Sequence, residues 1–577
     1  MEPLSNDFAF LLATHIIDDA DRDSTVDSQH QSQTLPPGSD CQHLEASRDR
    51  LLRELFKRSR TDLFYPYRRF VPRKAIREIL TQSKVQSHLK LSIPNAPLLR
   101  ELVVSIAPEL CHCDELKNRY CTGKRVIFAI LLRIGREDHI QHMKDDVCDN
   151  KLPLNAKDQS LAGLTRKQRK LFGNAQCQIR CHFLSNHHSD LDDCIKLDDG
   201  AVLPLIKRIN IRTDAALIEP EREITKIEIY DDHYDLDRPH LGSNIFVLKT
   251  FKNHEEGRGD FIAELEANRR VPKHDEIVQL LMAFEYGSEF HLIFPFAASG
   301  DLRSLWRMQG EADPELYSPA WVLKQCWGIA NALEAVHQPR TGENAATRVS
   351  QLHADINPSN ILCFESDGGG APTLKLSDFG CSRQVGPDGN IRVRDLEIHT
   401  KTYRPPEHDT EELICLRYDI WSLGCVYLDF VTWAIAGDNG YKKFARDRQS
   451  ETDHKLASKG NTNEDTFFKK TARPPPFYKL SGLMLKRIKA DEIEELENKN
   501  TRTLRSIHFS RGENEVRCEI KDTVNDHIRN LQNNSGPEFR GLLEIIQSRL
   551  LVIERHQRAS SDELRMLLDD LVEERAS

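Results

Sequence analysis

The stretch 351–362, QLHADINPSNIL, places His353, Asp355 and Asn360 in the order H-x-D-x-x-x-x-N. The tripeptide DFG follows, with Asp378 as its first residue. Carboxylate and amide oxygens are the hard ligands that Mg²⁺ prefers, so Asn360 and Asp378 could share divalent cations if the fold brings them together. A carboxylate such as Asp355 could accept the proton of an attacking hydroxyl group. Each motif alone is short enough to arise by chance, so its interpretation depends on the rest of the chain.

Other residues with chemical potential flank these motifs. Upstream, Lys249 ends the strand-like run FVLK, and Glu264 lies fifteen residues later in the helical pattern FIAELEA. Glu266, in the same pattern, is a rival for any role given to Glu264. Downstream, YRPPE occupies 403–407 and DIWSLGC occupies 419–425. The pieces share one order and each falls on an element of the expected type, which favours a single functional unit over coincidence.

This ordered set resembles the signature of the protein kinase superfamily, and the resemblance covers roughly residues 203–577. It implies an α+β, two-lobed protein-kinase-like fold, with a small β-rich N-lobe and a large helical C-lobe. It also implies transfer of the γ-phosphate of ATP to serine or threonine hydroxyls of a protein substrate, with Mg²⁺ as cofactor. Such phosphoryl transfer depends on positioning and charge neutralisation more than on covalent catalysis.

The resemblance gives each polar residue of the set a role. Lys249 would hold the α- and β-phosphates of ATP, and Glu264 would hold Lys249 in place as an ion pair. Asn360 and Asp378 would bind the metal ions, and Asp355 would accept the proton of the substrate hydroxyl. These five residues form the predicted catalytic and metal-binding set.

Adenine binding is expected between the two lobes. Phe294 falls where kinases keep the residue that guards the back of the ATP pocket. Residues 295–297, which include Phe296 and Ala297, would form the hinge whose backbone bonds adenine.

Two structural contacts are also implied for the C-lobe. Glu407 of YRPPE would meet Arg558 as a buried ion pair. Asp419 of DIWSLGC would hold the catalytic loop by accepting hydrogen bonds from its backbone N–H groups.

The region before the lysine strand departs from the kinase pattern. Kinases show G-x-G-x-x-G-x-V there, whereas residues 209–230 contain no glycine. Glycine lets backbone N–H groups approach phosphates closely, so side chains such as Leu217 are expected to weaken nucleotide binding. The acidic residues Glu219, Glu221 and Glu223 would repel a triphosphate.

The catalytic loop departs from the pattern at two positions. Asn357 stands where serine/threonine kinases usually have a lysine that neutralises the γ-phosphate, although Thr400 keeps the place of that lysine's partner. Losing this charge could cost on the order of 2–4 kcal/mol in the transition state. Ala354 replaces the arginine that many kinases have beside the aspartate, a non-RD arrangement. This predicts that the activation segment, 381–402, is not switched by a phosphate bound to that arginine.

Two functions therefore stand side by side. The intact lysine, glutamate, base and metal positions favour an active protein serine/threonine kinase. The missing glycines, Asn357 and Ala354 favour a pseudokinase, a kinase-shaped interaction or scaffold module with weak or no catalysis. A narrower resemblance, to fungal kinase-like proteins with an N-terminal helical region, rests on the runs IFAILLRIGRE and HLIFPF and the pattern FxxExEANxR.

The composition and the apolar pattern of the rest of the chain indicate how it is divided into regions. Residues 1–48 are polar and poor in aromatic residues, which is typical of disorder. Residues 49–202 carry helix-period apolar segments and form a predicted helical region that could contact partner proteins. The kinase-like domain would follow, with strands expected at 224–230, 244–251, 277–284 and 289–296 and a helix at 261–271. Its N-lobe would occupy 203–297 and its C-lobe 298–577, with an insertion at 438–535.

Composition sets further bounds. The net charge of −10 provides no general basic surface, so a nucleic-acid partner is not expected. No apolar run reaches the length of about 20 residues that a bilayer span needs, and no signal peptide is evident. We therefore expect an intracellular protein, cytoplasmic or nuclear.

The fourteen cysteines are scattered, which favours reduced thiols. One cluster contains Cys111, Cys113 and Cys121, with Cys177 and Cys181 further on. These spacings lack the paired C-x-x-C knuckles of common zinc sites, so ordinary thiols are expected there.

Overall fold

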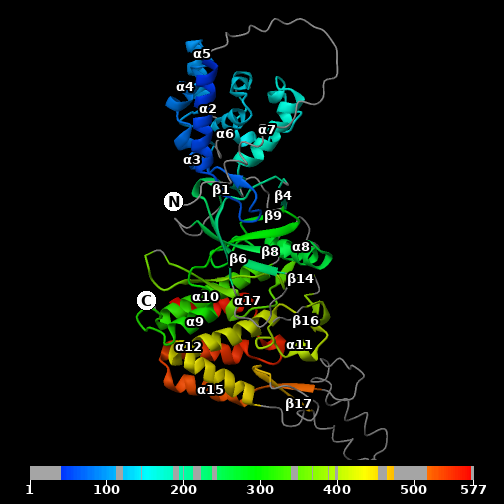
Figure 1. Ribbon diagram of the computed structural model, residues 1–577. Coiled ribbons are helices and arrows are strands. Elements are labelled where there is room, and N and C mark those ends of the chain that lie inside the picture. Colours follow the sequence, from blue (N-terminus) through cyan, green and yellow to red (C-terminus); the bar gives the residue numbers. More distant parts are fainter. Residues whose placement is uncertain are drawn as a thin grey trace, which may run out of the picture.

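The computed structural model describes residues 40–111, 113, 121–143, 146–185, 194–198, 200–211, 222–236, 244–338, 349–366, 368–386, 389–396, 400–451, 464–472 and 516–573. Figure 1 shows a group of helices at one end of the molecule, a β-sheet beside it, and a large helical lobe at the other end. The predicted α+β, two-lobed fold with a preceding helical region is confirmed.

The N-terminal unit is built around one fully buried helix. Its helices are α2 (Asp40–Lys57), α3 (Arg73–Ile79), α4 (Gln82–Leu89), α5 (Ala96–Ile106), α6 (Arg125–Arg133) and α7 (Arg166–Ile179). Every side chain of α6 from Val126 to Leu132 is buried, because the others surround its continuous apolar run. Helix α2 begins at Asp40, inside the segment 1–48 predicted to be disordered, while residues 1–39 lie outside the described part.

The N-lobe contains a six-stranded sheet in the order β4-β9-β10-β8-β6-β5. Its strands are β4 (Ile195–Lys196), β5 (Leu205–Asn210), β6 (Arg222–Ile229), β8 (Ile245–Lys252), β9 (Met282–Tyr286) and β10 (Glu289–Pro295). All neighbours are antiparallel except β4 and β9. Three predicted strands agree closely with β6, β8 and β10, but the one expected at 277–284 starts later, at Met282. Helix α8 (Glu255–Arg270) packs on β8 through the buried side chains of Phe261 and Leu265.

The two faces of this sheet have different neighbours. Phe246 and Leu248 of β8 point to one face, where the partly buried Phe64 and Tyr65 of the N-terminal unit also pack. The hydroxyl of Tyr286 lies 3.0 Å from Asp62 Oδ2, which fixes this contact by a hydrogen bond. The opposite face carries Lys249, because side chains alternate along a strand. The N-terminal unit therefore covers the back of the sheet, and Lys249 on the other face contacts the C-lobe.

The C-lobe is helical and has one large core. Its main helices are α9 (Leu302–Gln309), α10 (Pro319–His337), α12 (Arg417–Ser450), α15 (Asp522–Asn534), α16 (Pro537–Ile545) and α17 (Ser561–Glu573). The core includes three fully buried indole side chains, those of Trp306, Trp421 and Trp433. Helix α12 kinks at Gly437, whose φ of 65° favours glycine, and a Cβ there would meet the carbonyl oxygen of Gly310 at 2.8 Å.

Among the described residues, α12 is the one helix whose length and composition would let it cross a membrane. Most of its apolar window, 83%, is buried inside the protein.

Part of the interval 438–535 belongs to the C-lobe itself. The second half of α12 and helix α15 fall within it, and strands β17 (Phe468–Ala472) and β18 (Val516–Ile520) pair antiparallel. Glu464 reaches Arg404 of YRPPE at 2.5 Å. The remaining residues of the predicted insertion, 452–463 and 473–515, lie outside the described part.

The ion pair expected between Glu407 and Arg558 is present and fully buried. Arg558 Nη1 lies 2.6 Å from Glu407 Oε1, and Nη2 lies 2.6 Å from Oε2. This two-pronged geometry suits a planar guanidinium and a carboxylate. It ties the short helix α11 (Glu407–Thr410), which follows the activation segment, to the loop before α17.

Replacing Glu407 by alanine should therefore destabilise the protein strongly, because it leaves the Arg558 charge buried without its partner. We expect a loss of about 3–5 kcal/mol in the free energy of unfolding, measured by urea denaturation. Asp526→Ala is the matched control, since Asp526 pairs with Arg529 on the exposed surface of the same lobe. Equal effects of the two substitutions would contradict a structural role for the buried pair.

Candidate active site

The position of Lys249 follows from the centre of the N-lobe sheet. Lys249 lies on β8, between β6 and β10, and its side chain is buried. Its Nζ lies 2.7 Å from Glu264 Oε2. On α8, Glu264 shares the buried face with Phe261 and Leu265, because helical spacings of three and four residues fall on one side. Glu266, the other glutamate considered, is exposed and pairs with Arg270 at 2.6 Å. Glu264 is therefore the glutamate of α8 that pairs with Lys249.

Lys249 also connects the two lobes. Its Nζ lies 3.2 Å from Oδ1 of Asp378, a C-lobe residue whose side chain is partly exposed. Burial alone would raise the pKa of Asp378, but the Lys249 charge and the Gly380 N–H lower it to about 2. Phe379 is buried, with its ring 4.9 Å from that of His353. The DFG segment therefore turns its carboxylate toward the lysine and its phenyl ring into the core.

The catalytic loop, residues 353–360, is held in place by Asp419 at the start of α12. The backbone N–H groups of His353 and Ala354 donate to its two carboxylate oxygens, at 2.8 and 2.9 Å. His337 Nε2 lies 2.9 Å from the same carboxylate. The expected tether is thus observed. Ala354 adopts a φ of 69°, a conformation that side chains other than glycine rarely take, and the tether holds the loop there.

Asp355 and Asn360 are in direct contact. Asn360 Nδ2 donates to the carbonyl oxygen of Asp355 at 2.8 Å and to its Oδ2 at 2.9 Å. The amide oxygen of Asn360 is therefore the atom it could offer to a cation. Burial raises the pKa of Asp355, which makes this carboxylate a better proton acceptor than an exposed one.

A β-hairpin brings Asn360 and Asp378 to the same place. Strands β12 (Ile361–Phe364) and β13 (Thr373–Leu376) pair with Ile361 opposite Leu376. The next residues beyond this pair, Asn360 and Ser377, are joined by a 2.9 Å hydrogen bond from Ser377 N. Asp378 follows immediately, so the two predicted metal ligands lie at one end of the hairpin.

Asn357 takes part in a neutral hydrogen-bond network. Its Nδ2 donates to Thr400 Oγ1 at 3.3 Å and to the Asp355 carbonyl oxygen at 3.2 Å, and its Oδ1 accepts from Ser359 N. The expected partnership with Thr400 is therefore present without the positive charge of a lysine. Uncharged hydrogen bonds thus hold the loop at this position.

The predicted hinge, residues 295–297, begins at the last residue of β10. Phe294 packs against a small cluster of Val278, Ala297 and Phe364. The ring of Phe296 lies 4.1 Å from Nζ of Lys226, a residue that the sequence interpretation did not single out. Lys226 is paired with Val247 of β8, two residues before Lys249. The alternation of a strand therefore puts both ammonium groups on one face of the sheet, and this alternation in ITKIEIY was the signal available in the sequence.

Glu223 faces away from Lys249, contrary to the expectation that its carboxylate would repel a triphosphate. Glu223 is paired with Thr250, whereas its neighbour Ile224 is paired with Lys249. Glu223 thus faces the opposite side of the sheet from Lys249, where its carboxylate lies 2.9 Å from Arg208. It does not point at the lysine's face, because one residue along a strand reverses the direction of the side chain. Residues 212–221, with Leu217, Glu219 and Glu221, lie outside the described part.

A two-lobed domain in which a buried lysine–glutamate pair, a loop aspartate and a DFG aspartate meet between the lobes is a kinase-like phosphotransferase fold. A family model of the protein kinase domain matches residues 239–564, more than half of the chain. The chain therefore belongs to the protein kinase family.

Curated relatives agree with this family. A probable LRR receptor-like serine/threonine-protein kinase of Arabidopsis thaliana is 29% identical over 191 residues, 33% of this chain and 20% of that protein. A probable receptor-like protein kinase of the same plant is 29% identical over 193 residues, 32% of this chain and 48% of that protein. The chain thus spans half or less of the length of these relatives. Both are plant proteins, so the narrower resemblance to fungal kinase-like proteins is not supported by these matches.

The tether at Asp419 gives a direct test of the site's architecture. Asp419→Ala leaves the buried N–H groups of His353 and Ala354 without an acceptor, which should cost at least about 2 kcal/mol in the free energy of unfolding. Hydrogen exchange at these two amides should accelerate. Asp447→Ala, on the exposed side of the same helix α12, is the control. Unchanged exchange in the Asp419 variant would show that the loop is held by other contacts.

Proposed function

We propose that this protein is an ATP- and Mg²⁺-dependent kinase that phosphorylates serine or threonine hydroxyls of protein substrates. The proposal rests on the position of Lys249, whose ammonium lies within 3.2 Å of one carboxylate from each lobe. A Lys–Glu pair together with an inward-facing DFG aspartate is the arrangement that phosphoryl transfer requires in this family.

The residues between the lobes suit both ATP and a divalent cation. Asp378 stays ionised at neutral pH because its pKa is lowered to about 2, and Asn360 can offer its amide oxygen. Mg²⁺, when bound, would supply neutralisation of the phosphate charge. Lys249, released from Asp378, would hold phosphate oxygens, while Glu264 keeps it in place. Backbone groups of 295–297 would bind adenine.

Within this scheme Asp355 takes the proton of the substrate hydroxyl. Its contact with Asn360 aims the carboxylate, and its raised pKa favours proton acceptance. The weak point is Asn357, which contributes a hydrogen-bond donor but no charge at the transferred phosphate. We therefore expect slow turnover compared with kinases that carry lysine there.

The second candidate is a pseudokinase that works as an interaction or scaffold module. The neutral network of Asn357 and the glycine-free text of 209–230 favour it. The N-terminal unit, docked on the back of the N-lobe sheet, offers such a module a surface for partner proteins. Nucleotide binding separates the two candidates, because a scaffold does not need it.

ATP titration of the purified protein should raise its melting temperature in the presence of Mg²⁺, because ligand binding stabilises the folded state. Asp378→Asn should lose the Mg²⁺-dependent part of this shift. Asp526→Ala, at an exposed position of α15 in the C-lobe, should keep it. Absence of any nucleotide-dependent shift at millimolar ATP would favour the scaffold.

Incorporation of labelled phosphate into a generic protein substrate should be abolished by Asp355→Asn, since this variant cannot accept the hydroxyl proton. Equal incorporation by wild type and variant would refute the proposed activity.

Asn357→Lys should increase turnover, by up to about 10²-fold, because it restores positive charge beside Thr400. Ser359→Lys adds the same charge at an exposed neighbouring position and should leave the rate nearly unchanged. An unchanged rate in Asn357→Lys would count against the placement of Asn357 at the transferred phosphate.

A further inference from the structure

Four cysteines from three separate segments meet in the N-terminal unit. Cys111 and Cys113 follow α5, Cys121 precedes α6, and Cys148 lies in the loop after a 3-10 turn at Glu137–His142. The four sulfur atoms all lie within 4.8 Å of one another. Cys148 is the member that sequence spacing did not suggest, whereas Cys177 and Cys181 lie elsewhere, Cys177 on α7 and Cys181 beside Val202.

We propose that Cys111, Cys113, Cys121 and Cys148 bind one Zn²⁺ in a tetrahedral, four-thiolate site with a structural role. A tetrahedron with zinc–sulfur bonds of about 2.3 Å places its sulfur atoms about 3.8 Å apart, which small side-chain adjustments would reach from the observed spacing. Four thiolates in this geometry select zinc over the oxygen-preferring cations.

The surroundings argue against ordinary apolar packing of these cysteines. Among the described residues, they form a hydrophobic cluster whose members are all cysteines, separate from the leucine- and isoleucine-rich core of the same unit. Cysteines used as small apolar residues would be dispersed among aliphatic side chains. All four are free thiols, so cross-linking in pairs does not account for the cluster either.

Hydrogen bonds hold the backbone around the four cysteines in position. Asp149, next to Cys148, accepts from the N–H groups of Val126 and Ile127 at 3.0 Å each, which joins its loop to the start of α6. The N–H of Asp149 donates to the Gly123 carbonyl at 2.7 Å. Asn150 Nδ2 donates to Cys113 Sγ at 3.4 Å, and such a hydrogen bond would orient the thiolate toward a metal ion. The site is therefore organised in advance.

A cation here would connect segments that have little regular structure of their own. Short 3-10 turns at Glu137–His142, Asp149–Lys151 and Gln159–Leu161 are the helical elements described between α6 and α7. A zinc cross-link stabilises such loop-rich regions by tying distant parts of the chain together.

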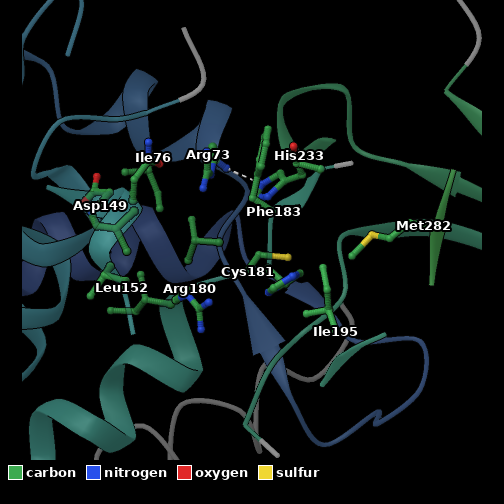
Figure 2. Close-up of a pocket in the computed structure, with 16 residues that line it drawn as sticks. Arg73, Ile76, Asp149, Leu152, Arg180, Cys181, Phe183, Ile195, His233 and Met282 are labelled. Atoms are coloured by element: carbon green, nitrogen blue, oxygen red, sulfur yellow. Dashed lines mark hydrogen bonds between the residues drawn. The ribbon is translucent and has the colours of Figure 1, made fainter. Parts of the chain in front are cut away.

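The same loop reaches the contact with the kinase N-lobe. Asp149 and Leu152 line a cavity of about 240 Å³ together with Arg73 of α3 and His233 of the N-lobe, as Figure 2 shows. The backbone N–H of Arg73 donates to His233 Nε2 at 2.9 Å. Zinc bound by the four cysteines would thus stabilise the loop of Asp149 and Leu152, on the side of the N-terminal unit that contacts the N-lobe.

Elemental analysis of the full-length protein, purified under reducing conditions, tests the site. We expect one zinc per chain, released by a thiol-specific mercurial reagent. Cys113→Ser and Cys148→Ser should each lose the bound zinc. Cys177→Ser, an exposed cysteine of α7 in the same unit, is the matched control and should retain it. Because the metal is measured directly, this result is independent of nucleotide binding and of kinase activity.

A second measurement on the wild-type chain covers the case in which the serine variants fail to fold. Removal of zinc by a strong chelator should lower the melting temperature by more than about 5 °C. Co²⁺ should restore it and give the intense visible absorption of tetrahedral cobalt–thiolate coordination. Wild type that contains no zinc and takes up no Co²⁺ after reduction would overturn the proposal. So would stoichiometric iron, or unchanged zinc content in a folded Cys148→Ser variant.

Discussion

The arrangement of the kinase domain depends on the ammonium of Lys249, which lies between a carboxylate of the N-lobe and one of the C-lobe. A buried lysine is unfavourable unless it is paired, and here Glu264 and Asp378 supply the pairing. The pairing to Glu264 requires α8 to lie against the sheet, and the pairing to Asp378 requires the DFG segment to face the N-lobe. One charged group therefore couples the position of a helix, a sheet and a loop.

Two sets of buried contacts in the C-lobe hold the segments next to this lysine site in place. Asp419 fixes the catalytic loop through two backbone N–H groups, and the pair of Glu407 and Arg558 fixes α11, which follows the activation segment. Both contacts are buried, so breaking either leaves polar groups without partners in the core. In contrast, Asn357 donates a hydrogen bond to Thr400 but contributes no positive charge. The residues that hold the architecture are thus different from the residue that lacks a charge at the site.

The N-terminal unit extends the N-lobe instead of standing apart from it. Its aromatic residues cover the back of the sheet, and Asp62 accepts a hydrogen bond from Tyr286. The loop that carries Cys148 also carries Asp149, which connects α6 with the cavity at the N-lobe. Changes in the stability of this unit can therefore reach the sheet that holds Lys249.

By itself, the sequence determined the fold family and most of the site, because the motif order from Lys249 to Arg558 and the alternation of the strands are local features that tertiary contacts did not override. Four decisions needed the tertiary structure. Which glutamate pairs with Lys249 depended on the face of α8 that packs on the sheet. Whether Glu223 shares the sheet face of Lys249 depended on strand register, and the position of Lys226 on that face became visible only once its strand was paired. Cys148, the fourth member of the cysteine cluster, was missed because it is distant in the chain from the other three, and only folding brings these loops together.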